Sequence, residues 1–124
     1  MKFILKTRRF SRWMKKTLLH DATLLVAIEE MERGLIDAEL GGYILKKRIA
    51  LPGRGKSGSV RTLIATKKED RWIFMIGFEK NEKENITSAE LAAIQALARD
   101  YLEFSDQMLL AVITSGQLEE VNHE

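Results

Sequence analysis

Three runs of β-compatible sequence lie close together in the middle of this chain of 124 residues. They cover residues 43–51, 60–68 and 72–78, and each combines β-branched, aromatic and other apolar side chains. The short polar turn Lys68–Arg71 joins the last two runs, which predicts a hairpin. A sheet is therefore expected at the centre of the fold.

Helical patterns flank these runs. After Asp21, a predicted N-cap, apolar residues recur at spacings of three and four up to Leu35, and Gly34 suits the end of the helix. The segment Thr87–Glu90 is a capping box that precedes a second apolar periodicity. Ser105 is the predicted cap of a last helix.

A short strand over residues 2–7 and a short helix beginning at Ser11 complete the pattern. The order is strand, helices, three strands, helices, without an internal repeat. This order predicts one α+β domain over residues 1–124.

Charge is distributed unevenly along the chain. The net charge is only +2, but residues 1–72 contain 17 basic and 8 acidic side chains, whereas residues 73–124 contain 3 basic and 10 acidic ones. Such an asymmetry favours a polyanionic partner for the basic part.

Composition excludes several classes of protein. The chain has no cysteine, which rules out disulfides and cysteine-ligated zinc and fits a reducing compartment. Its longest apolar runs, 24–28 and 108–113, are too short to span a bilayer, and the N-terminus lacks the features of a signal peptide. We therefore expect a soluble, cytoplasmic protein that makes no membrane contact.

The segment Gly53–Gly58 matches G-x-G-x-x-G, but a β-compatible run follows it. A dinucleotide site needs a helix there, because the helix N-terminus holds the pyrophosphate. A P-loop would need glycine where Ala50 stands, and the chain is too short for a kinase. His20 and His123 have no partner ligands in the sequence and are interpreted as surface residues, so neither a cofactor nor a metal is expected.

The most informative segment, residues 46–61, has six cations and no acid. Alternation along a strand places Lys46 and Arg48 on one face and Lys47 on the other, where an edge or concave position would be needed to keep Lys47 solvated. Such a cluster either binds phosphate or protects an exposed sheet edge, and the residues alone leave both interpretations open. Its members are Lys46, Lys47, Arg48, Arg54, Lys56 and Arg61.

Lys80 and Lys83 follow the last β-run. They belong either to a polar loop or to a second side of a phosphate-binding groove.

Four segments together resemble the RelE/HigB-type toxins of bacterial type II toxin–antitoxin systems. The resemblance covers nearly the whole chain in the same order, through residues 32–42, 46–58, 61–63 and 77–86. It implies a microbial RNase-type fold, with a twisted, mostly antiparallel sheet, N-terminal helices on one face and C-terminal helices. It also implies cleavage of mRNA in the ribosomal A site, where the 2′-hydroxyl attacks the adjacent phosphorus.

By position in the family's motifs, Arg61 corresponds to the arginine that follows the S-G turn. Lys47, Arg54 and Lys56 correspond to the basic residues before this turn, and Lys80 and Lys83 to those after the last strand. We hypothesise that Arg61 stabilises the phosphorane. Lys56 or Lys47 would be the general base, and Lys80 or Lys83 the general acid. Tyr101 lies on the apolar face of its helix and is predicted to belong to the core.

Two other functions remain open at this point. The same scaffold supports ParE-type toxins that act on DNA gyrase, and a third possibility is an RNA-binding protein or degenerate toxin without catalysis. In each toxin case the resemblance implies a cognate antitoxin, often with a helix-turn-helix domain.

Overall fold

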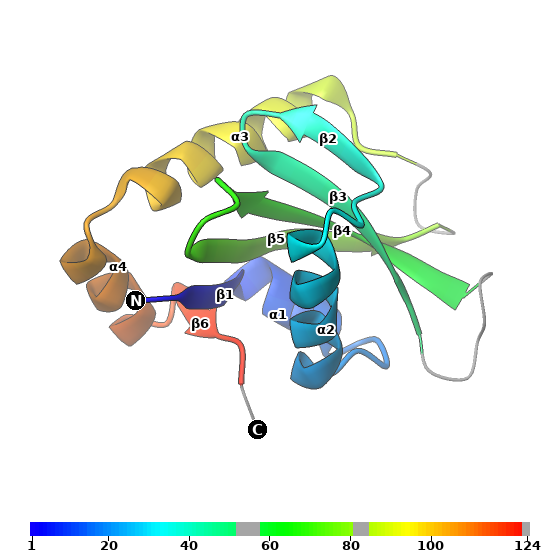
Figure 1. Ribbon diagram of the computed structural model, residues 1–124, viewed down its shortest axis with the longest axis horizontal. Helices are drawn as coiled ribbons and strands as arrows, with labels where there is room; N and C mark the ends of the chain where they lie inside the picture. The colour runs from blue at the N-terminus through cyan, green and yellow to red at the C-terminus, as the bar shows by residue number, and fades with distance from the viewer. Residues whose placement is uncertain (52–57, 81–84, 123–124) are drawn as a thin grey trace.

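A computed structural model describes residues 1–51, 58–80 and 85–122. In these residues the chain forms a mixed six-stranded sheet with four helices (Figure 1). The strands are β1 Phe3–Thr7, β2 Ala38–Gly41, β3 Ile44–Ala50, β4 Ser59–Thr66, β5 Arg71–Glu79 and β6 Leu118–Glu120. The helices are α1 Arg8–Met14, α2 Asp21–Glu32, α3 Ser88–Glu103 and α4 Asp106–Thr114.

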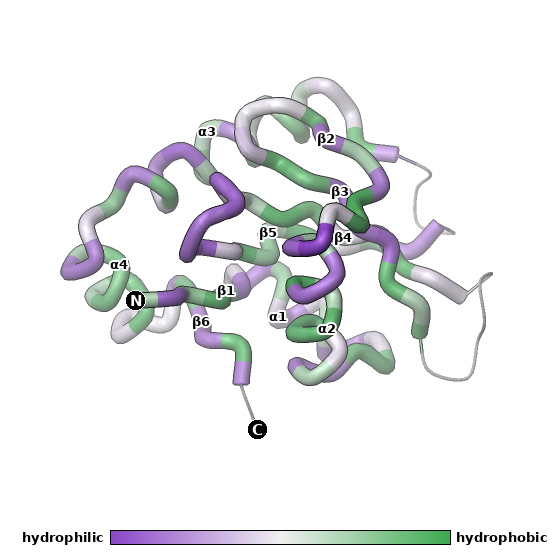
Figure 2. Tube along the Cα trace, viewed as in Figure 1, coloured by the Kyte–Doolittle hydropathy of each residue, from purple (hydrophilic) through white to green (hydrophobic). Residues whose placement is uncertain are grey.

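The strand order is β2-β3-β4-β5-β1-β6, and only β1 and β5 pair in parallel. Strands β1, β3 and β5 contain hydrophobic stretches, whereas the turn between β4 and β5 is hydrophilic (Figure 2). The predicted α+β class, the three central strands and the hairpin over the Lys68–Arg71 turn are thereby confirmed.

Each face of the sheet has its own core. One core joins α1 and α2 to the sheet through Phe10, Leu24 and Ile28, all almost fully buried. The other joins α3 and α4 to the opposite face through Ala98 and Leu109. Side chains that alternate along a strand therefore point into two different environments.

Three predicted details differ in the structure. The first short helix begins at Arg8 rather than near Ser11, because the Thr7 hydroxyl accepts a hydrogen bond from the Phe10 N–H and acts as the cap. The N-cap of α2 is His20, and Asp21 is the first helical residue. Strands β2 and β6 were not expected from the sequence, since runs of four and three residues are too short to show alternation.

A close approach fixes α1 on the sheet. A Cβ atom at Gly77 in β5 would lie 2.2 Å from the indole ring of Trp13, so only glycine leaves room for this ring. Trp13 also contacts Phe10, with ring centroids 5.4 Å apart. Helix α1, which directly follows β1, thus packs closely against the C-terminal half of β5.

Candidate nucleic-acid interface

Arg48 and Arg61 lie directly opposite each other on neighbouring antiparallel strands, β3 and β4. Lys46 shares their face, because its partner in the register is Leu63, which belongs to the core beneath α3 and α4. The Arg48 side chain is 56% exposed, and Lys46 and Arg61 are half-buried. The structure therefore brings three of the predicted cations together on one face of the sheet.

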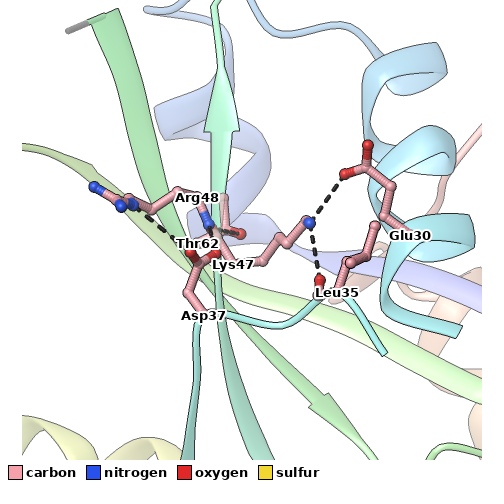
Figure 3. A network of polar contacts seen from close by, with 6 residues as sticks. All are labelled: Glu30, Leu35, Asp37, Lys47, Arg48 and Thr62. Carbon is pink, nitrogen blue, oxygen red and sulfur yellow. Dashed lines mark hydrogen bonds and ion pairs between the residues drawn. The ribbon is translucent and has the colours of Figure 1, made fainter. Parts of the chain in front are cut away.

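Like charges in directly opposed positions destabilise a strand pair. Asp37, just before β2, offsets this effect for Arg48 (Figure 3). Its Oδ2 accepts a 2.7 Å hydrogen bond from the Arg48 backbone N–H, and its Oδ1 lies 3.6 Å from the Arg48 Nε. Arg61 makes no ion pair with any residue that the structure describes.

Lys47 points to the opposite face, as its alternation predicts, but it is not solvated there. The residue is only 7% exposed. Its Nζ lies 2.9 Å from Glu30 Oε1 and donates a 2.8 Å hydrogen bond to the Leu35 carbonyl (Figure 3). The expectation of a solvated edge position is corrected: Lys47 lies beneath α2, on the other side of β3 from Arg48.

Lys80 is exposed and directly follows β5. Glu79, its neighbour in sequence, pairs with Val60, so Lys80 lies at the end of the sheet where β4 begins. Arg54 and Lys56, within residues 52–57, and Lys83, within residues 81–84, lie outside the described residues. So does His123, while His20 is an exposed helix cap.

An apolar layer supports the arginine pair. Phe78 is opposite Arg61 on the other neighbouring strand and is only 3% exposed. Tyr101 belongs to the same core at 3% exposure, which confirms its predicted place. Burial raises the pKa of Tyr101, although its hydrogen bond with Gln117 partly lowers it.

A comparison with known protein families shows which family this chain belongs to. A family model for the RelE toxin of the RelE/RelB toxin–antitoxin system matches residues 1–121. The chain belongs to the RelE toxin family. The match extends over every described strand and helix, so it concerns the whole domain rather than one motif. A search among curated proteins found no match.

Membership in the RelE family implies a toxin with a cognate antitoxin. Within the described parts of this RelE-family chain, no helix has the length and apolar character needed to cross a membrane. Nor do those parts contain a group of three histidine or acidic side chains placed to hold a metal ion.

Sequence reasoning did not identify two acidic residues of this region. Asp37 and Glu30 each contact one of the expected cations, Arg48 and Lys47 respectively. Their contacts depend on how α2 and β2 pack on β3, which no local pattern in the sequence shows. The sequence offers one signal for these contacts. Consecutive side chains of β3 point to opposite faces, so neighbouring cations need different partners.

Proposed function

We propose that this RelE-family chain is a ribosome-dependent mRNA interferase that acts in the cytoplasm. The observation that carries the proposal is the register pair of Arg48 and Arg61, with Lys46 on the same face. Planar guanidinium groups match the oxygens of a phosphodiester, and clustered cations bind RNA through its backbone. Arg61, which has no acidic partner among the described residues, can give its charge to such a phosphate.

In the proposed reaction the 2′-oxygen bonds to phosphorus as the bond from phosphorus to the 5′-oxygen breaks. Negative charge accumulates on the non-bridging oxygens, where Arg61 stabilises it, and this electrostatic contribution is usually the largest one. A base takes the proton of the 2′-hydroxyl, and an acid protonates the leaving 5′-oxygen. The products are a 2′,3′-cyclic phosphate and a 5′-hydroxyl.

The general base is assigned to Lys56 and the general acid to Lys80 or Lys83, from their positions in the family motifs. Lys47 is less suited to the role of base, because its amine contacts Glu30 and the Leu35 carbonyl on the far face of β3. We assign Lys47 to the support of β3, and Lys46 and Arg48 to RNA binding. Proton transfer by a well-placed group contributes about 10²- to 10⁴-fold to the rate.

The test is Arg61→Ala in a translating extract, with mRNA cuts mapped by primer extension. Arg99→Ala is the control, because Arg99 is an exposed arginine of α3 away from the arginine pair. We expect a folded Arg61→Ala protein to lose cleavage and the control to retain it. Full cleavage by the folded Arg61 variant would contradict the proposal, and gyrase-dependent DNA damage without mRNA cuts would favour a ParE-type activity.

A further inference from the structure

We propose that Tyr43, in the turn between β2 and β3, is a stacking platform for a nucleobase of single-stranded RNA. Its ring lies beside the ammonium group of Lys67, which is 5.3 Å from the ring centroid. An aromatic ring with a neighbouring cation suits a single strand, because a base stacks on the ring while the cation meets a phosphate. The choice of RNA as the ligand rests on the proposed function, and the platform extends the binding surface beyond the arginine pair.

The backbone of Tyr43 has a conformation that tyrosine rarely adopts. Its φ is +67°, and Gly42 before it has a φ of +59°. The two residues form a hairpin loop between the paired residues Gly41 and Ile44, and a loop of this kind usually has glycine at its second position. Bulky residues in the left-handed region are outliers, and such residues cluster at functional sites. The chain thus carries an aromatic ring where the turn alone favours glycine.

Neighbouring elements hold this turn in place. The Gln95 amide of α3 donates a 3.0 Å hydrogen bond to the Gly41 carbonyl. A Cβ atom at Gly42 would lie 2.8 Å from Gln95 Cγ, so a side chain there would displace this contact. On the other side, the Tyr43 carbonyl accepts a 2.9 Å hydrogen bond from the Thr66 N–H at the end of β4. The ring therefore projects from a fixed backbone, which lowers the entropic cost of binding.

The charges around the ring favour an anionic ligand. A pocket of about 290 Å³ adjoins Tyr43 between the β2–β3 and β4–β5 turns, and its charged lining residues are Glu39, Lys67 and Lys68. The Lys68 Nζ lies 3.1 Å from Glu39 Oε1, so these two charges neutralise each other. Lys67 is exposed and makes no ion pair with any described residue. Its charge is therefore left for a phosphate.

Two further acids of the β4–β5 turn do not line this pocket. Glu69 and Asp70 line a separate one with Arg71, towards α4. The Arg71 Nη2 lies 2.8 Å from Asp106 Oδ1, so that second pocket already contains its own ion pair. The space beside Tyr43 thus has one unneutralised charge, which is positive.

Strand β3 connects this platform to the arginine pair. Tyr43 directly precedes the strand, and Arg48 lies five residues further along it, which is roughly 16 Å at about 3.3 Å per residue. Lys46 lies between them, on the same face as Arg48. An extended RNA strand with a phosphate at Arg48 and Arg61 can therefore pass Lys46 and place a base a few nucleotides away on Tyr43.

The experiment measures binding of a short labelled RNA by fluorescence anisotropy. The RNA carries 2′-O-methyl groups, which block the attacking oxygen and exclude cleavage. Tyr43→Gly is the main variant, because glycine suits a left-handed position, and Tyr43→Phe is its control, because it keeps the ring. We expect Tyr43→Gly to weaken binding by about tenfold and Tyr43→Phe to bind like the wild type. Tyr43→Gly should melt at the wild-type temperature or above it, so the loss is not one of folding.

Salt dependence separates stacking from charge. Tyr43→Gly should leave the slope of log affinity against log salt unchanged, because stacking releases no counterions. Lys67→Gln should make this slope shallower, and Arg99→Gln is the control for a lost surface charge. A slope that becomes shallower in Tyr43→Gly as in Lys67→Gln would overturn the stacking role.

RNAs with a single abasic nucleotide at successive positions identify the stacked base. At one position we expect the wild type and Tyr43→Gly to bind with equal affinity, because the base that Tyr43 would hold is missing. Wild-type affinity of Tyr43→Gly for intact RNA, or an equal loss for every RNA of the series, would overturn the inference. Loss of affinity for the protein of the neighbouring gene, and not for RNA, would overturn it in favour of a protein interface.

The outcome for the platform is distinct from the outcome for mRNA cleavage. RNA binding that depends on Tyr43, in a chain that leaves mRNA uncut on translating ribosomes, would support the platform and contradict the proposed cleavage. Cleavage of mRNA by the wild type, together with wild-type RNA affinity of Tyr43→Gly, would contradict the platform alone.

Discussion

The ammonium group of Lys47 lies 2.9 Å from the carboxylate of Glu30, and this contact joins the last turn of α2 to β3. Its neighbours in sequence, Lys46 and Arg48, point to the opposite side of the sheet. One run of three cations thus divides into a structural residue and two surface residues.

Replacement of Lys47 should therefore reduce stability rather than catalysis. Because Lys47→Met leaves the Leu35 carbonyl without its hydrogen bond and Glu30 without its cation, we expect the free energy of unfolding to fall by about 1–3 kcal/mol. Urea denaturation measures this change. A variant of unchanged stability that no longer cleaves mRNA would instead return Lys47 to the role of general base.

Asp37 should act through Arg48. Asp37→Asn keeps an oxygen for the Arg48 backbone N–H but removes the negative charge beside its guanidinium. We expect KM for RNA to rise by roughly tenfold, because Arg48 binds RNA and is misplaced without this charge, while kcat stays the same. Steady-state cleavage measures the two constants separately.

The control for this prediction is the same substitution in an Arg48→Ala background. If Asp37 acts only by positioning Arg48, Asp37→Asn changes the kinetic constants little in the Arg48→Ala background. The effects of the two substitutions are then strongly non-additive. A loss of the same size in both backgrounds would mean that Asp37 acts independently of Arg48.

Salt dependence should separate the cations that meet phosphate from those that do not. For single-stranded RNA, the slope of log affinity against log salt is about −0.7 per neutralised phosphate. Arg48→Gln and Arg61→Gln should each make the slope shallower by about that amount, and Arg99→Gln should leave it unchanged. Fluorescence anisotropy with a short labelled RNA at several salt concentrations gives the three slopes.

Gly77→Ala should displace α1. The added methyl group would overlap the Trp13 ring at 2.2 Å, and overpacking of this kind costs about 1–3 kcal/mol. Thermal unfolding measures the loss. The double variant Trp13→Leu/Gly77→Ala should lose less than the sum of the single effects, and simple additivity would show that the ring is not the obstacle.

Much of the fold could be predicted from the sequence, because its signals are local. The strands β3, β4 and β5 are long enough to show their composition, and Thr87 and Ser105 cap helices as expected. The pairing of β1 with β5 and β6 could not be predicted, since it joins segments that lie far apart in the sequence. For the candidate interface, alternation correctly separated Lys47 from Arg48, but their acidic partners depend on tertiary packing.

The position of β1 between β5 and β6 has a consequence for the order of folding. Strand β1 pairs with Arg71–Glu79 and with Leu118–Glu120, both of which are synthesised long after it. Contacts between such distant segments form slowly, because a long loop must close first. The nascent chain therefore cannot complete the described sheet until Leu118–Glu120 has been made and has paired with β1.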